Sequence, residues 1–361
     1  MGIVGLPNVG KSSTFNLISK LQVKAENSPF STIDPNEATV QINDERFDKL
    51  VEIYKPKKEI KATLNIFDIA GLVPDAHLGY GLGNSFLSHI LAVDGIYHMV
   101  RAFSKKKIIH TEGEVDPVRD LQIISHELVM KDKQLMGKRL EELDKKMKNN
   151  KDQELKRQYQ IIEKAIACLD QGKWIKDYDW SFDEIYLLNK HPCFTAKNIV
   201  YLVNISKKSF LKKKSKWLPK IKEWVESNCK GKIIPFSVEY EQELAKGFIE
   251  GESYLDKILK TGYETLNLIH FFTVGKDEVR CWTVRKGSTA PEAAGVIHSD
   301  FREGFINAQV FSYEDLLEYK TEKNIKANGK LRTEGKSYIV KDGDIILFKF
   351  HPPKKSKKEK Q

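Results

Sequence analysis

The segment Gly5-Leu-Pro-Asn-Val-Gly-Lys11-Ser12 combines residue types and spacing that can bind a polyphosphate. It matches the pattern GxxxxGK(S/T), between a short apolar strand pattern and apolar residues at helical spacing. In such a strand-to-helix loop, glycines let backbone N–H groups approach phosphate oxygens. We expect Lys11 to reach the β and γ phosphates and Ser12 to bind Mg²⁺. The alternative is a chance glycine turn before a core helix.

Further along the chain, Asp68-Ile-Ala-Gly71 closes an apolar strand pattern and forms a DxxG motif, which is specific only in combination with the upstream loop. In P-loop NTPases an Asp at this strand end holds Mg²⁺ through water, and the glycine N–H responds to the γ phosphate. Thr32 lies in a loop flanked by prolines. It would complete the metal shell, unless that loop is an ordinary turn.

Leu72 follows the DxxG motif, where many GTPases carry a glutamine that orients the attacking water. Leucine cannot orient water, so a hydrolase built this way must take a polar group from elsewhere. His77 and His110 are the candidates, although a single histidine is more often a plain surface residue.

The strand pattern over 198–204 ends in Asn204-Ile-Ser-Lys207, where guanine-specific proteins carry NKxD. Lys207 would present a cation where guanine needs a paired acceptor, and losing such a contact costs a few kcal/mol. The amide of Asn204 offers adenine both a donor and an acceptor. We therefore expect ATP in preference to GTP, with the Ser237 backbone contacting the base. The alternative is that Asn204 only caps the strand and neighbouring backbone selects the base.

The elements that must position these residues alternate along the chain. Strand patterns near 1–5, 62–68, 95–103, 199–204 and 232–237 alternate with helical stretches, which predicts a three-layer α/β sheet. We assign the rest of the chain around that sheet as follows: 1–115 and 185–266 to a discontinuous P-loop nucleotide-binding domain, 116–184 to an inserted antiparallel helical hairpin, 267–350 to a small α+β domain, and 351–361 to a disordered basic tail.

The composition bounds the class of protein. With 361 residues, 40% of them hydrophobic, the chain can form roughly two or three domains with their own cores. Lys and Arg (60) exceed Asp and Glu (50), and the resulting charge of +10 favours a polyanionic partner, nucleic acid first. Four cysteines without metal-ligand spacing disfavour a disulfide framework or a zinc site. No apolar run approaches the ~20 residues of a membrane span, so we expect a cytoplasmic protein without a membrane partner.

Several motifs, in order, resemble the Obg-like ATPase (YchF) family over nearly the whole chain. They are the phosphate-loop segment 5–12, Ser-Pro-Phe-Ser-Thr-Ile-Asp-Pro-Asn (28–36), Asp-Ile-Ala-Gly-Leu-Val (68–73) and Gly-Leu-Gly-Asn-Ser-Phe-Leu-Ser-His-Ile (81–90). The C-terminal Ala-Pro-Glu-Ala-Ala-Gly (290–295) and Asp-Gly-Asp (342–344) are similar too. The resemblance implies a P-loop NTPase of GTPase ancestry that prefers ATP and ends in a TGS domain.

The resemblance also assigns roles to residues. It implies that Ser12 and Thr32 bind Mg²⁺, that Asn204 and Ile205 hold adenine, and that His110 is a candidate catalytic residue on a mobile loop. The phosphate-binding residues would be Asn8, Val9, Gly10, Lys11, Ser12 and Ser13. Asn8 is similar to the asparagine of potassium-activated relatives, which adds K⁺ as a candidate cofactor. The chain departs from the family at Lys207, commonly glutamate, and at Ser28, commonly phenylalanine.

Residues and resemblance together predict an α/β fold of the P-loop NTPase (Ras-like GTPase) type that hydrolyses ATP with Mg²⁺. Its switch loops would couple nucleotide state to docking on the ribosome or ribosomal RNA, as a translation- or stress-related regulator, with no DNA sequence specificity. Two alternatives stay open. One is a GTPase of the same fold, and the other is a non-catalytic RNA- or ribosome-binding factor gated by ATP.

Overall fold

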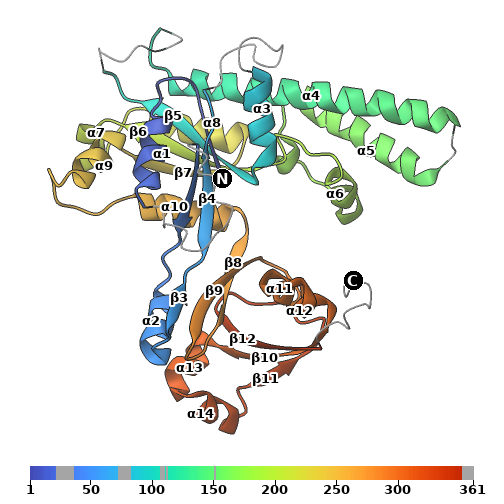
Figure 1. The fold of residues 1–361 in the computed structure, drawn as a ribbon. Helices are drawn as coiled ribbons and strands as arrows, with labels where there is room; N and C mark the ends of the chain where they lie inside the picture. The colour runs from blue at the N-terminus through green and yellow to red at the C-terminus, as the bar shows by residue number, and fades with distance from the viewer. Residues whose placement is uncertain (22–35, 72–82, 106–109, 111–112, 150–151, 352–361) are drawn as a thin grey trace, which may run out of the picture. The chain divides into compact units, whose positions relative to one another are not determined.

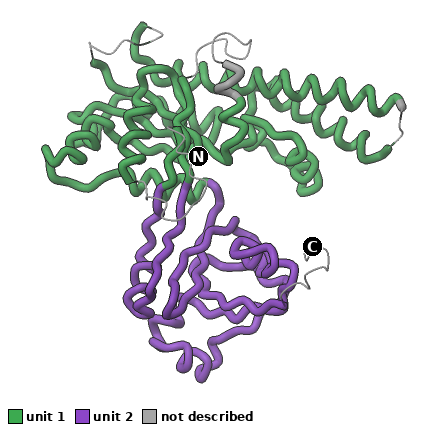
Figure 2. Tube along the Cα trace, viewed as in Figure 1, with its two compact units in different colours: residues 1–39, 65–265 green, residues 40–64, 266–361 purple. Residues whose placement is uncertain are grey.

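A computed structural model describes residues 1–21, 36–71, 83–105, 110, 113–149 and 152–351 of the chain. The chain divides into two compact units, which Figure 2 shows in different colours. Unit 1 contains Met1–Thr39 and Asn65–Thr265, and unit 2 contains Val40–Leu64 and Leu266–Gln361. Each unit is described by itself below.

The described part of unit 1 is built on a six-stranded sheet in the order β2-β4-β1-β5-β6-β7 (Figure 1). Its strands are β1 (Gly2–Val4), β2 (Glu37–Gln41), β4 (Thr63–Asp68), β5 (Gly95–Ala102), β6 (Asn198–Ile205) and β7 (Lys232–Phe236). The strands from β4 to β7 in this order pair in parallel, and every residue of β5 is buried. Such burial is typical of a parallel sheet with helices on both faces. The five predicted strands are confirmed, whereas β2 was not predicted.

Helices connect and cover these strands, and the parallel order brings the loops that follow them to one edge of the sheet. The helices of unit 1 outside the insertion are α1 (Lys11–Ser19), α3 (Gly83–Ala92), α7 (Lys207–Leu211), α8 (Leu218–Asn228), α9 (Val238–Ala245) and α10 (Leu255–Thr265). The described residues that directly follow β1, β4, β5, β6 and β7 therefore lie at that edge, and several of them were singled out from the sequence.

The insertion is helical, as predicted. It comprises α4 (Pro117–Asn149), α5 (Gln153–Asp170), the short η2 (Ile175–Asp177) and α6 (Phe182–Leu188), and α4 packs along α5 (Figure 1). Heptad spacing in the sequence of α5 is followed by Leu155, Tyr159, Ile162, Ile166 and Leu169. Of these, Ile162 and Leu169 are buried, and Ile161, Ala165 and Cys168 outside that spacing are buried too. Burial is wider than a heptad seam because α5 also contacts α6 and η2.

Unit 2 holds a second sheet, in the order β11-β10-β12-β8-β9-β3 among the described residues. The strands are β3 (Lys58–Ile60), β8 (Leu268–Thr273), β9 (Glu278–Arg285), β10 (Phe305–Ser312), β11 (Arg332–Glu334) and β12 (Asp344–Phe350). The helices are α2 (Glu45–Tyr54), α11 (Ala290–Ile297), α12 (Ser299–Glu303), α13 (Tyr313–Tyr319) and α14 (Glu322–Ala327). The α+β character expected for 267–350 is present, and outside the strands Ile339 forms an isolated antiparallel bridge with Thr289.

Residues 40–64 differ from the expected division, which placed them in the nucleotide-binding domain. In the structure they belong to unit 2, because β3 pairs in parallel with β9 and extends that sheet. Phe47, Leu50 and Ala62 are buried in one core with residues from β8 and β9, including Phe272 and Val279. No sequence pattern within 40–64 indicates that this segment packs against residues more than two hundred positions later in the chain.

The predicted fold class, a P-loop α/β sheet with a helical insertion and a smaller α+β part, is confirmed. Among the described helices, none has the length and apolar character needed to cross a bilayer. The four cysteines are free and buried. Nearly all of the predicted basic tail, from residue 352 onward, lies outside the described residues.

Candidate nucleotide-binding site

The loop between β1 and α1 has the backbone geometry of a phosphate cradle. Asn8 has φ 61° and Gly10, which precedes the first helical residue, has φ 106°. A side chain at Gly10 would be strained by that φ, and its Cβ would lie 2.8 Å from Asn204 Nδ2. The free N–H groups at the start of a helix favour an anion at this position. Glycine at position 10 is therefore required by both the turn and the close approach of Asn204.

Lys11 lies at the base of this loop and is almost fully buried. Its Nζ donates a hydrogen bond to the carbonyl oxygen of Leu6 at 2.8 Å. Burial lowers the pKa of Lys11 to about 8, against the opposing effect of the negative charge of Asp68. A Cβ built on Gly71 would lie 3.1 Å from the Lys11 Nζ. The structure therefore brings the lysine of the first motif to the aspartate and glycine of the second.

Asp68 ends β4, where that strand pairs in parallel with β1 opposite Ile3. Its Oδ1 is buried and has no hydrogen-bond partner among the described residues. A buried carboxylate oxygen without a partner is unfavourable unless a cation or its water shell satisfies it. Ser12 is exposed in the first turn of α1, so its hydroxyl is accessible to a ligand. These features fit the Mg²⁺ that accompanies a nucleotide.

The described residues contain no group of three or more His, Cys, Asp or Glu that could hold a metal ion without help. Magnesium at phosphate sites needs no such group, because one or two protein oxygens, water and the phosphates complete its octahedral shell. Thr32, the other predicted ligand, lies outside the described residues, as do Leu72 and His77.

Asn204 is buried and joins two parts of the site. Its Nδ2 donates to the carbonyl oxygen of Val9 at 3.0 Å, and its Oδ1 accepts from the backbone N–H of Val238 at 3.2 Å. The amide thus ties the phosphate loop to the start of α9. Ser237 is fully buried, and its hydroxyl caps α9 by accepting from the N–H of Tyr240.

A cavity of about 540 Å³ connects the phosphate loop to the loop after β6. This volume is within the usual range for small-molecule sites. Of the predicted nucleotide-binding residues, Asn8, Gly10, Ser13, Asn204 and Ile205 line it, whereas Val9, Lys11, Ser12, Gly71 and Ser237 do not. The other lining residues are Phe103, Ser104, Lys105, Ser206, Val238, Glu239 and Gln242.

Sequence reasoning missed several of these lining residues. Lys105 and Glu239 form an ion pair at 3.3 Å, and Gln242 lies one turn further along α9. The signal that could have identified them is their position, since they follow β5 and β7 at the edge where parallel strands end. Lys207 was singled out but does not line the cavity, and it is paired with Glu243 of α9 instead.

His110 lies apart from this cavity. It is buried, and its Nε2 is 2.9 Å from Oδ2 of Asp120 in the first turns of α4. Burial raises the pKa of Asp120, although His110 and Arg119 pull it in the opposite direction. His110 is therefore not among the residues that line the cavity, and in this structure its imidazole bonds to Asp120.

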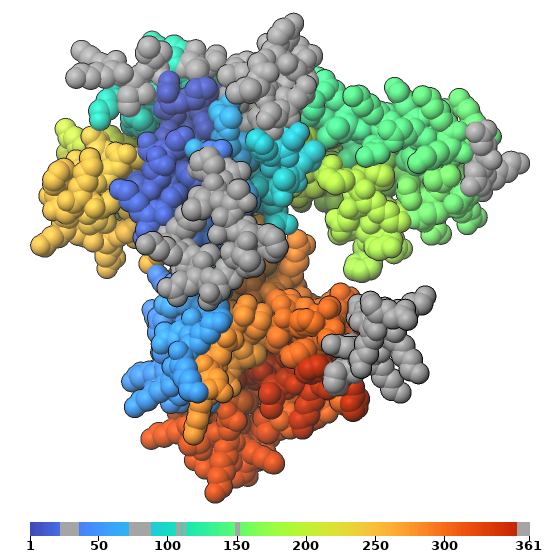
Figure 3. All heavy atoms as spheres, in the orientation of Figure 1, coloured from blue at the N-terminus to red at the C-terminus, as the bar shows by residue number. Residues whose placement is uncertain are grey.

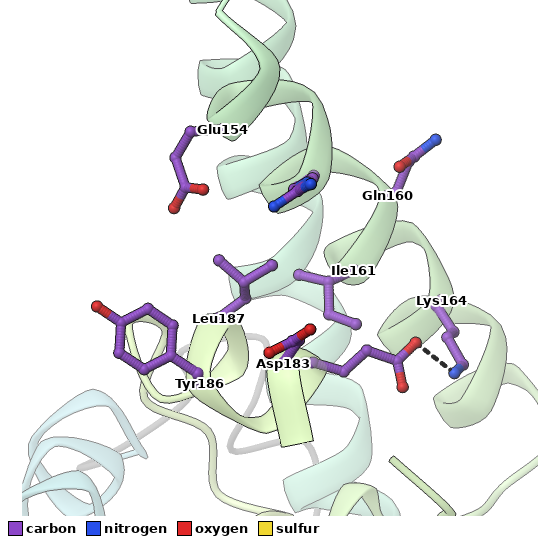
Figure 4. A pocket seen from close by; sticks show the side chains of 9 residues that line it. Glu154, Gln160, Ile161, Lys164, Asp183, Tyr186 and Leu187 are labelled. Carbon is purple, nitrogen blue, oxygen red and sulfur yellow. Dashed lines mark hydrogen bonds and ion pairs between the residues drawn. The ribbon is translucent and has the colours of Figure 1, made fainter. Parts of the chain in front are cut away.

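A second cavity, of about 460 Å³, lies between α5 and α6 (Figure 4). Glu154, Ile161 and Leu187 are among its lining residues, and Lys164 pairs with Glu184 at its edge. Its charged residues are of mixed sign, and no phosphate-binding loop borders it. The cavity lined by Gly10 and Asn204 is therefore the candidate nucleotide site.

Comparisons with known proteins agree with this geometry. Residues 1–164 match a family described as "50S ribosome-binding GTPase", and residues 268–351 match YchF-GTPase_C, "Protein of unknown function (DUF933)". The chain is 51% identical to Obg-like ATPase 1 of Homo sapiens over 372 residues, which cover 99% of this chain and 94% of that protein. It is also 51% identical to Obg-like ATPase 1 of Oryza sativa subsp. japonica over 361 residues, or 97% and 92% of the two chains.

A solved structure is similar as well. The YchF GTPase of Schizosaccharomyces pombe aligns with a TM-score of 0.85 at 47% identity, covering 96% of this chain and 97% of that one. The similarity spans both units, including the phosphate loop and the C-terminal sheet. The resemblance predicted from the motifs is thus confirmed, and this chain belongs to the Obg-like ATPase (YchF) family of P-loop NTPases.

Proposed function

We propose that this chain is a cytoplasmic, Mg²⁺-dependent ATPase that prefers ATP to GTP and docks on ribosomal RNA according to its nucleotide state. The proposed preference for ATP over GTP rests on one observation. A single cavity joins the phosphate loop to the loop after β6, while Lys207, at the position of the guanine-binding Asp, is held outside it by Glu243.

The lining of this cavity favours adenine over guanine. Guanine presents two donors, N1–H and N2–H, that need a carboxylate acceptor. Glu239 is the only carboxylate among the described lining residues, and Lys105 already pairs with it. Adenine presents a donor and an acceptor. The second N–H and the second lone pair of the Asn204 amide, or the amide of Gln242, can match them.

The phosphate end of the site supplies positioning and electrostatic stabilisation, which phosphoryl transfer chiefly requires. Lys11 and the N–H groups at the start of α1 would hold the β and γ phosphates, with Asn8, Gly10 and Ser13 along the cavity wall. Asp68 and Ser12 would hold Mg²⁺, which neutralises phosphate charge when bound. K⁺ remains a candidate additional cofactor near Asn8.

The relatives' names support hydrolysis but disagree on the base. Obg-like ATPase 1 is named for ATP, whereas the Schizosaccharomyces pombe relative is named a GTPase. The ribosomal part of the proposal is supported by the description "50S ribosome-binding GTPase" of the family that matches residues 1–164, and by the charge of +10. RNA carries dense negative charge, so a basic protein binds it strongly at low salt.

The variant Lys207→Asp tests the base preference, because it restores the fourth residue of NKxD. We expect wild-type protein to bind ATP more tightly than GTP in calorimetric titrations with Mg²⁺. We expect Lys207→Asp to tighten GTP binding by roughly tenfold, since one good bidentate contact contributes about 1–3 kcal/mol.

The matched control is Lys232→Asp, which makes the same charge change and also breaks an ion pair, with Glu264, away from the cavity. Its ATP and GTP affinities should equal those of the wild type. Tighter GTP than ATP binding by the wild type would overturn the preference. If phosphate release with Mg²⁺, K⁺ and ribosomes stays at background, the non-catalytic alternative is correct.

A further inference from the structure

The segment between β6 and α9 carries a concentration of lysine that the nucleotide site does not use. Residues 205–222 contain no Asp or Glu and eight lysines: Lys207, Lys208, Lys212, Lys213, Lys214, Lys216, Lys220 and Lys222. The segment forms α7, a connecting turn and the first part of α8, and all of these lysines except Lys207 are exposed. In Figure 3 the gold residues around α9, which contacts both α1 and α7, lie at the surface of unit 1 beside the dark blue α1.

Most of this positive charge is not neutralised locally. Lys207 pairs with Glu243, and Lys222 approaches Glu226 at 3.7 Å. The other six lysines have no ion-pair partner in the part of the chain that the structure describes. Like charges held this close repel one another. A polyanion bound over the segment would relieve this repulsion and so lower the free energy.

An aromatic side chain lies within this basic surface. Trp217 caps α8, and the ammonium groups of Lys216 and Lys220 lie 4.9 and 5.6 Å from its ring centre. Trp217 and Lys220 also line a cavity of about 580 Å³ at the start of α4, with Asp116, Val118, Glu223, Trp224, Ser227 and Asn228. The cavity is therefore lined by a lysine, two tryptophans and two carboxylates, Asp116 and Glu223.

The lysines, the Trp217 ring and the two carboxylates together favour one class of polyanion over the others. A lipid surface would need apolar side chains to insert, and an acidic peptide would be repelled by Asp116 and Glu223. A nucleic acid strand satisfies both parts, because its phosphates suit the lysines and its bases can stack on Trp217. The amino groups of a base can also donate to carboxylates such as Asp116 and Glu223, which phosphates avoid.

We propose that residues 208–220, together with the cavity beside Trp217, bind single-stranded RNA, with the backbone along the lysines and a base against the Trp217 ring. The proposal rests on the RNA docking in the proposed function and gives it a site. The site is contiguous with the nucleotide cavity, because Ser206, the N-cap of α7, lines that cavity.

The test measures binding of a fluorescent mixed-sequence oligoribonucleotide of about twelve nucleotides to the full chain over a range of salt concentrations. The triple variant Lys208→Gln, Lys212→Gln, Lys214→Gln removes three contacts. Because each phosphate contact contributes about −0.7 to the salt slope on single strands, the slope should become shallower by roughly 2. The control, Lys138→Gln, Lys145→Gln, Lys146→Gln, removes the same charge from exposed positions of α4 and should leave the slope unchanged.

Trp217 is tested separately, because a stacking contact is insensitive to salt. Trp217→Leu should weaken RNA binding roughly tenfold at every salt concentration with the slope unchanged, and Trp217→Phe should recover most of the affinity. Circular dichroism spectra equal to that of the wild type show that each variant folds.

Equal losses of slope in the two triple variants would overturn the proposal, as would a Trp217→Leu variant with wild-type affinity. Binding to anionic vesicles without binding to RNA would also overturn it. ATP turnover measured without RNA separates the two proposals. Normal turnover with no RNA binding rejects the RNA docking and this site but leaves the ATPase, whereas absent turnover with intact RNA binding rejects the ATPase.

Discussion

Asn204 shows how far a single residue can be interpreted from sequence. Its place at the end of a buried strand, three positions before the residue where guanine-binding proteins carry Asp, predicted a base contact. The structure shows a different use, since both polar ends of the amide bond to Val9 and Val238. Sequence could place Asn204 at the site, because parallel strands end at one edge. It could not show the bridge, which depends on a close approach between the loops after β1 and β7.

The bridge leads to a prediction for Asn204→Ala. The change leaves the Val9 carbonyl and the Val238 N–H buried without partners, so it should destabilise unit 1 by about 1–3 kcal/mol. The affinities for ATP and GTP should both fall, because the phosphate loop serves both, and that for ATP should fall further, because the proposed adenine contact of the amide is lost as well. Thermal unfolding and parallel titrations with the two nucleotides measure this. A loss confined to ATP would show instead that the amide acts by reading adenine.

Lys11 leads to a prediction about pH. Its pKa is lowered to about 8 by burial, and a bound phosphate favours the charged form, which raises that pKa. Binding is therefore strongest where free Lys11 is already protonated, below pH 8, and weakens as the pH rises through 8. Between pH 7.5 and 9 the Kd for ATP should rise roughly eightfold. Lys11→Arg stays charged throughout, so any binding that it retains should be nearly independent of pH.

At the scale of elements, strong local patterns were predicted correctly and long-range anchors were not. The β1–α1 loop, β4, β6 and the helical hairpin all follow from apolar periodicity and glycine positions. The anchors are single side chains whose partners are distant in sequence. Asp132 of α4, for example, is fully buried and accepts from the N–H groups of Phe194 and Thr195. Burial raises its pKa to about 6, and no spacing rule identifies such a carboxylate.

The pair His110–Asp120 anchors the residues after β5 to α4, and it conflicts with a direct catalytic role in the described geometry. If His110 leaves Asp120 and assists hydrolysis, His110→Ala should lower kcat at least about tenfold, because general acid–base groups contribute 10²–10⁴. The Kd for ATP should change less than twofold, since His110 does not line the cavity. Single-turnover phosphate release and equilibrium titration separate the two quantities. An unchanged kcat with a lowered melting temperature would assign His110 a structural role only.

At the scale of the whole molecule, each compact unit is built from two stretches that are separate in the sequence. Residues 40–64 leave unit 1 between β2 and β4 and complete unit 2. They supply β3 at the edge of its sheet and α2 against its core. A polar cluster adds to this, because Arg46 bonds to both Asp44 and Asp342, and Asp44 also bonds to His270. The pKa of Asp44 stays well below its usual range because His270 and Arg46 outweigh the effect of burial.

This arrangement predicts how unit 2 behaves alone. A fragment of residues 266–351 lacks Phe47 and Leu50, so Phe272, Val279 and Phe311 would lose part of their cover and β9 would become an unpaired edge. We expect this fragment to be poorly folded or to aggregate, as measured by near-UV circular dichroism and amide NMR dispersion. The same fragment preceded by residues 40–64 and a Gly/Ser linker should fold cooperatively.

Within the fused fragment, Phe47→Ala should cost about 3–5 kcal/mol of unfolding free energy, whereas the exposed Lys55→Ala control avoids the core. Cooperative folding of 266–351 alone, with no gain from residues 40–64, would show that the segment is only attached to unit 2 and does not complete it.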